Sequence, residues 1–234
     1  MQLRTNKIAT GGYRYASKFF LFVFGPKLFK GANEILFWWY KKIIEGRLGN
    51  SHFEDFFTTF FEFSYHDYKD KKVLDIGCGP RGSLEWANNT FERIGIDPLA
   101  NKYVKMEGKH HKMNYINSGA ENIPFYDEYF DFVSSLNSLD HVDDLDQCIK
   151  EIKRVVKKGG FFLLISDIHS FPTVAEPSNF GWDVAKKFEP EFSIEMEKNF
   201  EGSNMYKSLR ENVIFDHSNS EDRYGILALK LKKN

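Results

Sequence analysis

Apolar positions follow two patterns along the chain, a helical spacing and short continuous runs. From about residue 72 onward these patterns predict strands separated by helices. Residues 143–156 carry apolar side chains at helical spacing with charged side chains opposite, as a helix that covers a sheet should. Other runs are short, apolar and bounded by glycine, proline or polar residues, which is typical of strands buried on both faces. The order of these elements predicts βαβ units and a parallel sheet. The predicted strands are 73–76, 93–97, 130–136 and 161–166.

The C-terminal part of the chain predicts two further strands. Residues 192–197 alternate apolar and acidic side chains, as a half-exposed strand does, and residues 224–231 are mostly apolar. Residues 180–188 predict a short helix. The polar stretch 198–222 predicts no element.

The first 70 residues are rich in aromatic side chains and predict helices. The apolar run Phe19–Phe24 is far shorter than the roughly 20 residues of a membrane span. The residues before it lack the compact basic start of a secretory signal. Helical periodicity then appears in 32–47 and in 52–65, the latter with Ser51 as a candidate N-cap.

A polar linker, residues 66–72, leads into the first strand and divides the chain into a helical segment, 1–70, and a second domain, 71–234. We interpret the helical segment as an aromatic-rich layer packed on the sheet. Weak association with a membrane surface is a second interpretation, which the scattered distribution of Lys and Arg disfavours.

Charge and cysteine content exclude several classes of function. The 234 residues include 32 Lys+Arg and 33 Asp+Glu, and the net charge of −1 gives no basic field that would attract nucleic acid. The two cysteines, Cys78 and Cys148, form neither a metal-binding nor a disulfide pattern. We therefore expect a reducing, cytoplasmic setting.

A glycine-rich turn after the first predicted strand carries the clearest chemical signal. Gly77, Gly79 and Gly82 satisfy G-x-G-x-x-G, which predicts a nucleotide at a strand-to-helix turn. Asp75 would repel a pyrophosphate, and Pro80 removes an N–H from the loop that would bind one. The pattern therefore favours a cofactor that carries an ammonium and a sulfonium. A NAD-dependent oxidoreductase on the same sheet is the alternative, which Asp75 disfavours.

Further motifs follow in order: G-I-D-P, A-E-N-I-P-F, L-D-H-V-D-D and V-K-K-G-G, after D-I-G-C-G-P. Together they cover roughly residues 73–167. On these motifs the chain resembles the class I S-adenosylmethionine (SAM) dependent methyltransferases, close to the ubiquinone/menaquinone-biosynthesis-type branch. The resemblance implies an α/β, Rossmann-like, doubly wound seven-stranded sheet, mostly parallel with the last strand antiparallel. It also implies that residues 1–70 form a helical lid over the acceptor and that 71–234 bind SAM, with S-adenosylhomocysteine as product.

The resemblance also assigns cofactor-binding residues by motif. The first motif would hold the methionine end of SAM, the second the ribose, the third the adenine side, and the end of the fourth strand the methyl-transfer centre. Gly119 departs from the pattern, because many relatives carry an aspartate there. The assigned residues are Asp75, Gly77, Cys78, Gly79, Asp97, Pro98, Ala120, Glu121, Leu136 and Asn137.

His141 is the candidate general base, because it lies just past the fourth strand, at the carboxyl edge where ligands bind in open α/β sheets. Asp167 leaves the fifth strand at the same edge and is its candidate partner, and His169 is a second candidate base. The acidic residues near His141 are explained by the N-terminus of the following helix, so no metal is expected.

Several sequence motifs are missing, and their absence narrows the class of acceptor. There is no Asn-Pro-Pro-aromatic run after the fourth strand, no basic stripe, and no double-loop feature of protein-arginine methylation. We therefore expect methyl transfer to a small molecule, to an oxygen nucleophile on a sugar, a phosphorylated or a secondary metabolite. A non-catalytic SAM-binding or partner-binding module and a lipid or quinone methyltransferase at a membrane surface are the alternatives.

Overall fold

The computed structural model describes residues 30–169, 171, 176, 178, 180–202 and 204–234. The apolar run Phe19–Phe24 lies outside these residues. The chain divides into two compact units, Met1–Gly46 and Arg47–Asn234. In the first unit, residues 30–45 are helical, which confirms most of the helix expected over 32–47. No helix of the described residues is long and apolar enough to cross a membrane.

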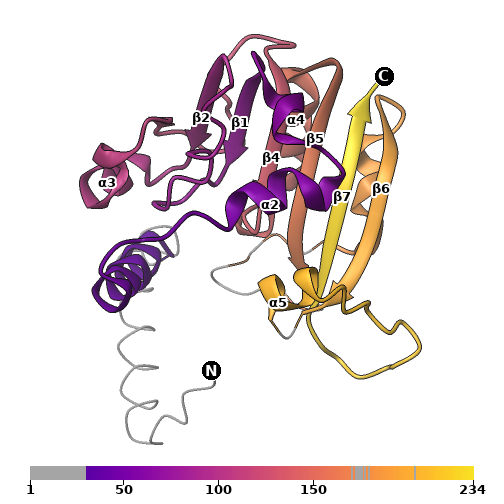
Figure 1. Ribbon diagram of the computed structural model, residues 1–234. Coiled ribbons are helices and arrows are strands. Elements are labelled where there is room, and N and C mark those ends of the chain that lie inside the picture. The colour runs from indigo at the N-terminus through magenta and orange to yellow at the C-terminus, as the bar shows by residue number, and fades with distance from the viewer. Residues whose placement is uncertain (1–29, 170, 172–175, 177, 179, 203) are drawn as a thin grey trace, which may run out of the picture. The chain divides into compact units, whose positions relative to one another are not determined.

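The second unit is built on a seven-stranded sheet in the order β3-β2-β1-β4-β5-β7-β6 (Figure 1). Strands β1 to β5 pair in parallel, and β7 runs antiparallel between β5 and β6. This confirms the expected mostly parallel sheet with an antiparallel last strand. The strands are β1 Lys72–Ile76, β2 Glu92–Ile96, β3 Asn114–Ile116, β4 Phe130–Leu136, β5 Val156–Ile168, β6 Phe192–Glu201 and β7 Gly225–Lys233.

Both faces of the sheet are covered, which explains why the central strands are continuously apolar. Successive side chains of a strand point to opposite faces. In β5, Phe162 and Leu164 pack into one hydrophobic cluster and Leu163 and Ile165 into another. The first cluster contains helix α4 (Leu145–Val155) and the second contains α2 (Phe53–Phe57), so each face has its own core layer.

The N-terminal part of the second unit forms an aromatic layer against the sheet, as its composition predicts. After α2, two 3₁₀ helices follow, η1 (Thr59–Phe61) and η2 (Tyr65–Tyr68). Tyr68 stacks on Phe132 of β4 with ring centroids 4.3 Å apart. The expected N-cap Ser51 is wrong by one residue, because α2 starts after His52, which makes no side-chain capping bond.

The expected helix after the glycine-rich loop is not formed, and residues 77–91 consist of turns and bends. Pro80 and the asparagines before β2 leave too short a stretch for a regular helix. Side chains hold this segment instead. The guanidinium of Arg93 donates to the carbonyl oxygens of Leu84 and Glu85, at 3.2 and 2.8 Å.

Helix α4 agrees with its prediction and begins at a cap, because the Asp144 carboxylate accepts from the Gln147 N–H at 3.0 Å. It ends at Val155, and β5 already includes the glycine pair Gly159–Gly160. The remaining helices are short. They are α3 (Ala100–Met106), η3 (Gly108–His110), η4 (Leu139–His141), η5 (Trp182–Phe188) and α5 (Met205–Arg210).

Candidate functional site

Asp75 lies near the end of β1 with its side chain buried, 2% exposed. Its two carboxylate oxygens accept hydrogen bonds from the hydroxyls of Ser83 and Ser134. Burial, opposed by these bonds, raises the pKa of Asp75 to about 7, and the charge of Asp97 contributes. Neither oxygen is paired with a cationic side chain in the described part of the chain. A buried carboxylate of this kind is stabilised by a positively charged ligand.

The loop that follows Asp75 is held between the ends of three strands. Gly77 and Gly79 have φ of +70° and +56°, which L-residues with a side chain rarely adopt. The Gly77 N–H donates to the carbonyl oxygen of Ile96 at the end of β2, at 2.8 Å. On the other side, Ser138 beyond β4 packs so closely that a Cβ on Gly77 would lie 2.2 Å from Ser138 Cβ.

Asp97 follows β2 directly and is partly exposed. Its carboxylate accepts from the Leu99 N–H at 2.8 Å, across the turn that contains Pro98. Cys78 is buried against β2, since a Cβ on Gly95 would lie 2.5 Å from its Sγ. Burial, with the charges of Asp97 and Asp75, raises the pKa of the Cys78 thiol well above its usual value. The thiol is therefore a small packing group and not a nucleophile.

Glu121, expected on the adenine side, supports the start of the next helix. One of its carboxylate oxygens accepts from the Asp143 N–H at 2.9 Å. The other would lie 2.6 Å from a Cβ on Gly119. A longer side chain at position 119 would displace this carboxylate, which gives a physical reason for the glycine where relatives carry an aspartate. Ala120 between them is buried.

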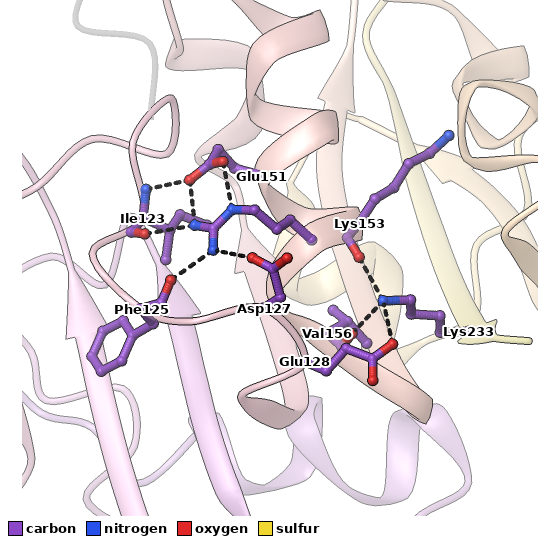
Figure 2. A network of polar contacts seen from close by, with 9 residues as sticks. Ile123, Phe125, Asp127, Glu128, Glu151, Lys153, Val156 and Lys233 are labelled. Carbon is purple, nitrogen blue, oxygen red and sulfur yellow. Dashed lines mark hydrogen bonds and ion pairs between the residues drawn. The ribbon is translucent and has the colours of Figure 1, made fainter.

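A network of polar contacts fixes the segment that follows (Figure 2). The Arg154 guanidinium on α4 donates to the carbonyl oxygens of Ile123 and Phe125, at 2.8 and 2.6 Å, and to the carboxylate of Asp127. Glu151 pairs with Arg154 at 2.7 Å and also accepts from the Ile123 N–H at 2.8 Å. The segment from residue 123 to 127 is thus bound to α4 at four points, three on its backbone and one on the Asp127 side chain.

The end of β4 makes a tight turn at the carboxyl edge. Leu136 is half-buried, and Asn137 adopts φ +54° while its N–H donates to the carbonyl oxygen of Ile165, at 2.6 Å. The hydroxyl of Ser138 donates to the carbonyl oxygen of Ile76, at 2.6 Å. These bonds place the expected methyl-transfer segment beside the loop after β1.

Beyond this turn, acidic and imidazole side chains gather at the carboxyl ends of β4 and β5. Asp140 is buried and its carboxylate lies 3.8 Å from His141 Nε2. Burial raises the pKa of Asp140. Burial and the charges of Asp140 and Glu176 raise the pKa of Asp167 to about 7. The structure thus places His141 and Asp167 near one group of charges.

Sequence patterns missed four residues of this site. Ser83, Ser134 and Ser138 solvate the buried end of β1, but a serine in a strand or loop gives no signal without its partner. Glu176 lies in the loosely patterned segment after β5 and reaches the site only through the fold.

These residues fit SAM. Among the described residues the buried Asp75 carboxylate has no cationic partner, and a second carboxylate, Asp97, follows the neighbouring strand. This arrangement suits a cationic cofactor with ribose hydroxyls and not a pyrophosphate. The charge of Asp97 contributes to the raised pKa of Asp75, so the two carboxylates lie close enough to interact.

Comparison with known proteins agrees with this geometry. Residues 74–164 match the family model of the methyltransferase domain. The chain is 32% identical to tocopherol O-methyltransferase, chloroplastic, of Arabidopsis thaliana over 49% of this chain and 35% of that protein. It is 27% identical to the ubiquinone/menaquinone biosynthesis C-methyltransferase UbiE of Campylobacter jejuni over 42% of this chain and 45% of that protein. A putative S-adenosylmethionine dependent methyltransferase of Listeria monocytogenes shares its fold, with TM-score 0.54 and 17% identity over 72% of this chain and 92% of that one.

The comparisons confirm the expected resemblance to methyltransferases and the Rossmann-like fold. The chain spans less than half the length of the curated relatives named above.

Proposed function

We propose that this chain transfers a methyl group from SAM to a small-molecule acceptor, since residues 74–164 match the family model of the methyltransferase domain. The observation that carries the proposal is the buried Asp75 carboxylate, which is solvated by serine hydroxyls and lies beside the Gly77 loop and Asp97. Two neighbouring carboxylates at the carboxyl ends of β1 and β2 match the ammonium and the ribose hydroxyls of SAM.

Different residues would bind different parts of the cofactor. Asp75, Gly77, Cys78 and Gly79 would receive its methionine end, because the glycines admit close backbone approach. The second set would bind the nucleoside and border the methyl group, and comprises Asp97, Pro98, Ala120, Glu121, Leu136 and Asn137.

Bound SAM supplies an electrophilic methyl group on a sulfonium that leaves as a neutral thioether. The protein then has to orient the acceptor and receive its proton. We assign proton acceptance to His141, which is partly exposed at the end of η4. Asp167 at the end of β5 would support the cationic form of the imidazole through the shared group of charges.

For the acceptor we propose an oxygen nucleophile on a sugar, a phosphorylated or a secondary metabolite. A second candidate is a lipid or quinone acceptor at a membrane surface. The relatives named above are an O-methyltransferase of tocopherol and a C-methyltransferase of ubiquinone/menaquinone biosynthesis. The helix over 30–45 also exposes large apolar side chains: Leu36, Phe37, Trp39, Tyr40, Ile43 and Ile44.

The test is the formation of S-adenosylhomocysteine from SAM with two acceptor panels, hydroxylated sugars and metabolites in buffer, and prenylated phenols or quinols in lipid vesicles. Turnover with either panel supports methyl transfer and selects the acceptor class. His141→Ala should slow turnover, while His110→Ala, which changes an exposed histidine, should not. Turnover with neither panel, despite cofactor binding, would favour a non-catalytic SAM-binding module.

A further inference from the structure

Three side chains at the carboxyl edge of the sheet are arranged like the ligands of a metal ion. Asp140, His141 and Glu176 each offer one ligand atom, and these atoms all lie within 4.8 Å of one another. Asp140 and His141 come from η4, after β4, and Glu176 comes from the segment that follows β5. Ser178 ties the two parts together, because its N–H donates to the Asp140 carbonyl oxygen at 3.2 Å and its hydroxyl to the Val142 carbonyl oxygen at 2.7 Å.

Asp140 supplies a second observation that points to a ligand. Its side chain is 1% exposed, and among the described residues neither carboxylate oxygen has a hydrogen-bond partner. The contact with His141 Nε2, at 3.8 Å, is too long for a hydrogen bond. Buried carboxylates are normally hydrogen-bonded, paired or bound to metal, because an isolated buried charge is very costly.

His169 supplies a third observation, because its hydrogen bond to a backbone carbonyl oxygen fixes which ring nitrogen carries the proton. Its Nδ1 lies 2.6 Å from the carbonyl oxygen of Phe171, which can only accept, so Nδ1 carries the proton. In the neutral ring, Nε2 then presents a lone pair. That atom is buried without a hydrogen-bond partner in the described residues and lies 3.7 Å from a Glu176 carboxylate oxygen. An imidazole whose N–H is bound to a backbone carbonyl is the usual arrangement of a histidine near a metal.

From this geometry we propose that Asp140, His141 and Glu176 bind a divalent transition-metal ion of the Mn²⁺ to Zn²⁺ class, with His169 bordering the site. Mixed carboxylate and imidazole donors suit these ions better than Mg²⁺ or Ca²⁺, which prefer oxygen ligands alone. The charge of the ion would offset the free-energy cost of burying these carboxylates. The sequence pattern had suggested only a helix N-terminus here, because Glu176 lies 35 residues beyond His141 and belongs to no motif.

A consequence for the acceptor rests on the proposed methyl transfer. Three protein ligands leave coordination positions open, and an acceptor hydroxyl or phenol oxygen could occupy one of them. With the ion bound, His141 is one of its ligands, and the role of base assigned to His141 above applies to the protein without the ion. The ion would thus select acceptors with an oxygen nucleophile.

The experiment is a calorimetric titration of the chelator-treated full chain with Mn²⁺ and, separately, with Zn²⁺, without cofactor or acceptor. We expect one saturable site, and affinity reduced by about tenfold or more in Asp140→Asn, His141→Ala and Glu176→Gln, the scale seen for groups that orient or hold a metal. Asp143→Asn is the matched control, since it removes an exposed carboxylate next to the cluster and should leave affinity unchanged.

No saturable binding of either ion, or equal affinity in all three variants and the control, would overturn the proposal. Thermal unfolding of each variant checks that it folds, and Glu176→Gln, which changes a partly exposed residue, carries the test if Asp140→Asn does not fold. S-adenosylhomocysteine binding is measured on the same preparations. If the unmodified chain binds cofactor but no metal, the metal site alone is refuted, and if it binds metal but no cofactor, the methyltransferase proposal alone is refuted.

Discussion

Ser138, just beyond β4, packs directly against Gly77 at the end of β1, and a Cβ on Gly77 would lie 2.2 Å from Ser138 Cβ. The hydroxyl of Ser138 meanwhile donates to the carbonyl oxygen of Ile76. The two central strands therefore meet at their carboxyl ends through a contact that only glycine permits. The proposed cofactor loop and the proposed methyl-transfer segment share this contact.

Gly77→Ala should destabilise the protein and abolish cofactor binding. The alanine would be strained at φ +70°, which costs about 1–2 kcal/mol, and would collide with Ser138, which adds about 1–3 kcal/mol. Gly159→Ala is the matched control, since Gly159 has φ +75° with nothing within 4 Å of the added Cβ. Denaturant unfolding should show the larger loss for Gly77→Ala. Equal losses would mean that the contact with Ser138 relaxes at no cost.

The buried Asp75 should make the stability of the unliganded protein fall with rising pH. Its folded pKa, about 7, lies above the ordinary value of 3.8, so between these values the folded state binds a proton that the unfolded state lacks. The stabilisation is complete below about pH 4 and is lost as the pH rises through 7. Asp75→Asn should reduce the slope between pH 5 and 7.5, measured by urea unfolding, and the slope that remains is due to Asp167, whose pKa burial also raises to about 7. An unchanged slope would show that Asp75 titrates normally.

Binding of a cationic cofactor should release a proton from Asp75. A positive charge beside the carboxylate favours its ionised form and lowers its pKa from about 7. Calorimetric titration with SAM at pH 6.5, in two buffers of different ionisation enthalpy, should reveal this release, and affinity should rise between pH 6 and 8. Identical apparent enthalpies in the two buffers would contradict a contact between Asp75 and the cofactor.

Arg154→Ala should destabilise the domain by about 2–4 kcal/mol, because it leaves the mostly buried Glu151 carboxylate without its ion pair. It also removes the bonds to the Ile123 and Phe125 carbonyl oxygens, which should loosen the 119–125 segment and weaken cofactor binding. Lys157→Ala, which breaks a partly exposed pair with Asp131, should cost no more than about 1 kcal/mol. Unfolding and cofactor titration of both variants make the comparison, and equal losses would argue against a special role for Arg154.

The sequence predicted most of the sheet because buried strands have a strong local signature. The apolar run 130–136 and the amphipathic period over 143–156 agree closely with β4 and α4 of the structure. Strand β3, Asn114–Ile116, is only three residues long and carries no such signature. The absent helix after Pro80 shows that a motif predicts the loop better than the element that follows it.

The residues of the candidate site could be predicted only where they belong to a sequence motif. Asp75 lies near the end of β1 and Asp97 directly follows β2, both in recognisable sequence patterns. The hydroxyls that solvate Asp75 come from Ser83 and Ser134, 8 and 59 residues away in the chain. Glu176 approaches Asp140 through the connection after β5. Such partners depend on tertiary contacts, which periodicity and composition do not encode.

The most direct test of the account is calorimetric titration of the full chain with S-adenosylhomocysteine and, in parallel, with NAD. We predict saturable one-to-one binding of S-adenosylhomocysteine that is weakened by Asp97→Asn, and no binding of NAD. Binding of NAD without binding of S-adenosylhomocysteine would contradict the assignment of Asp75 and Asp97 to a cationic methyl-donor site.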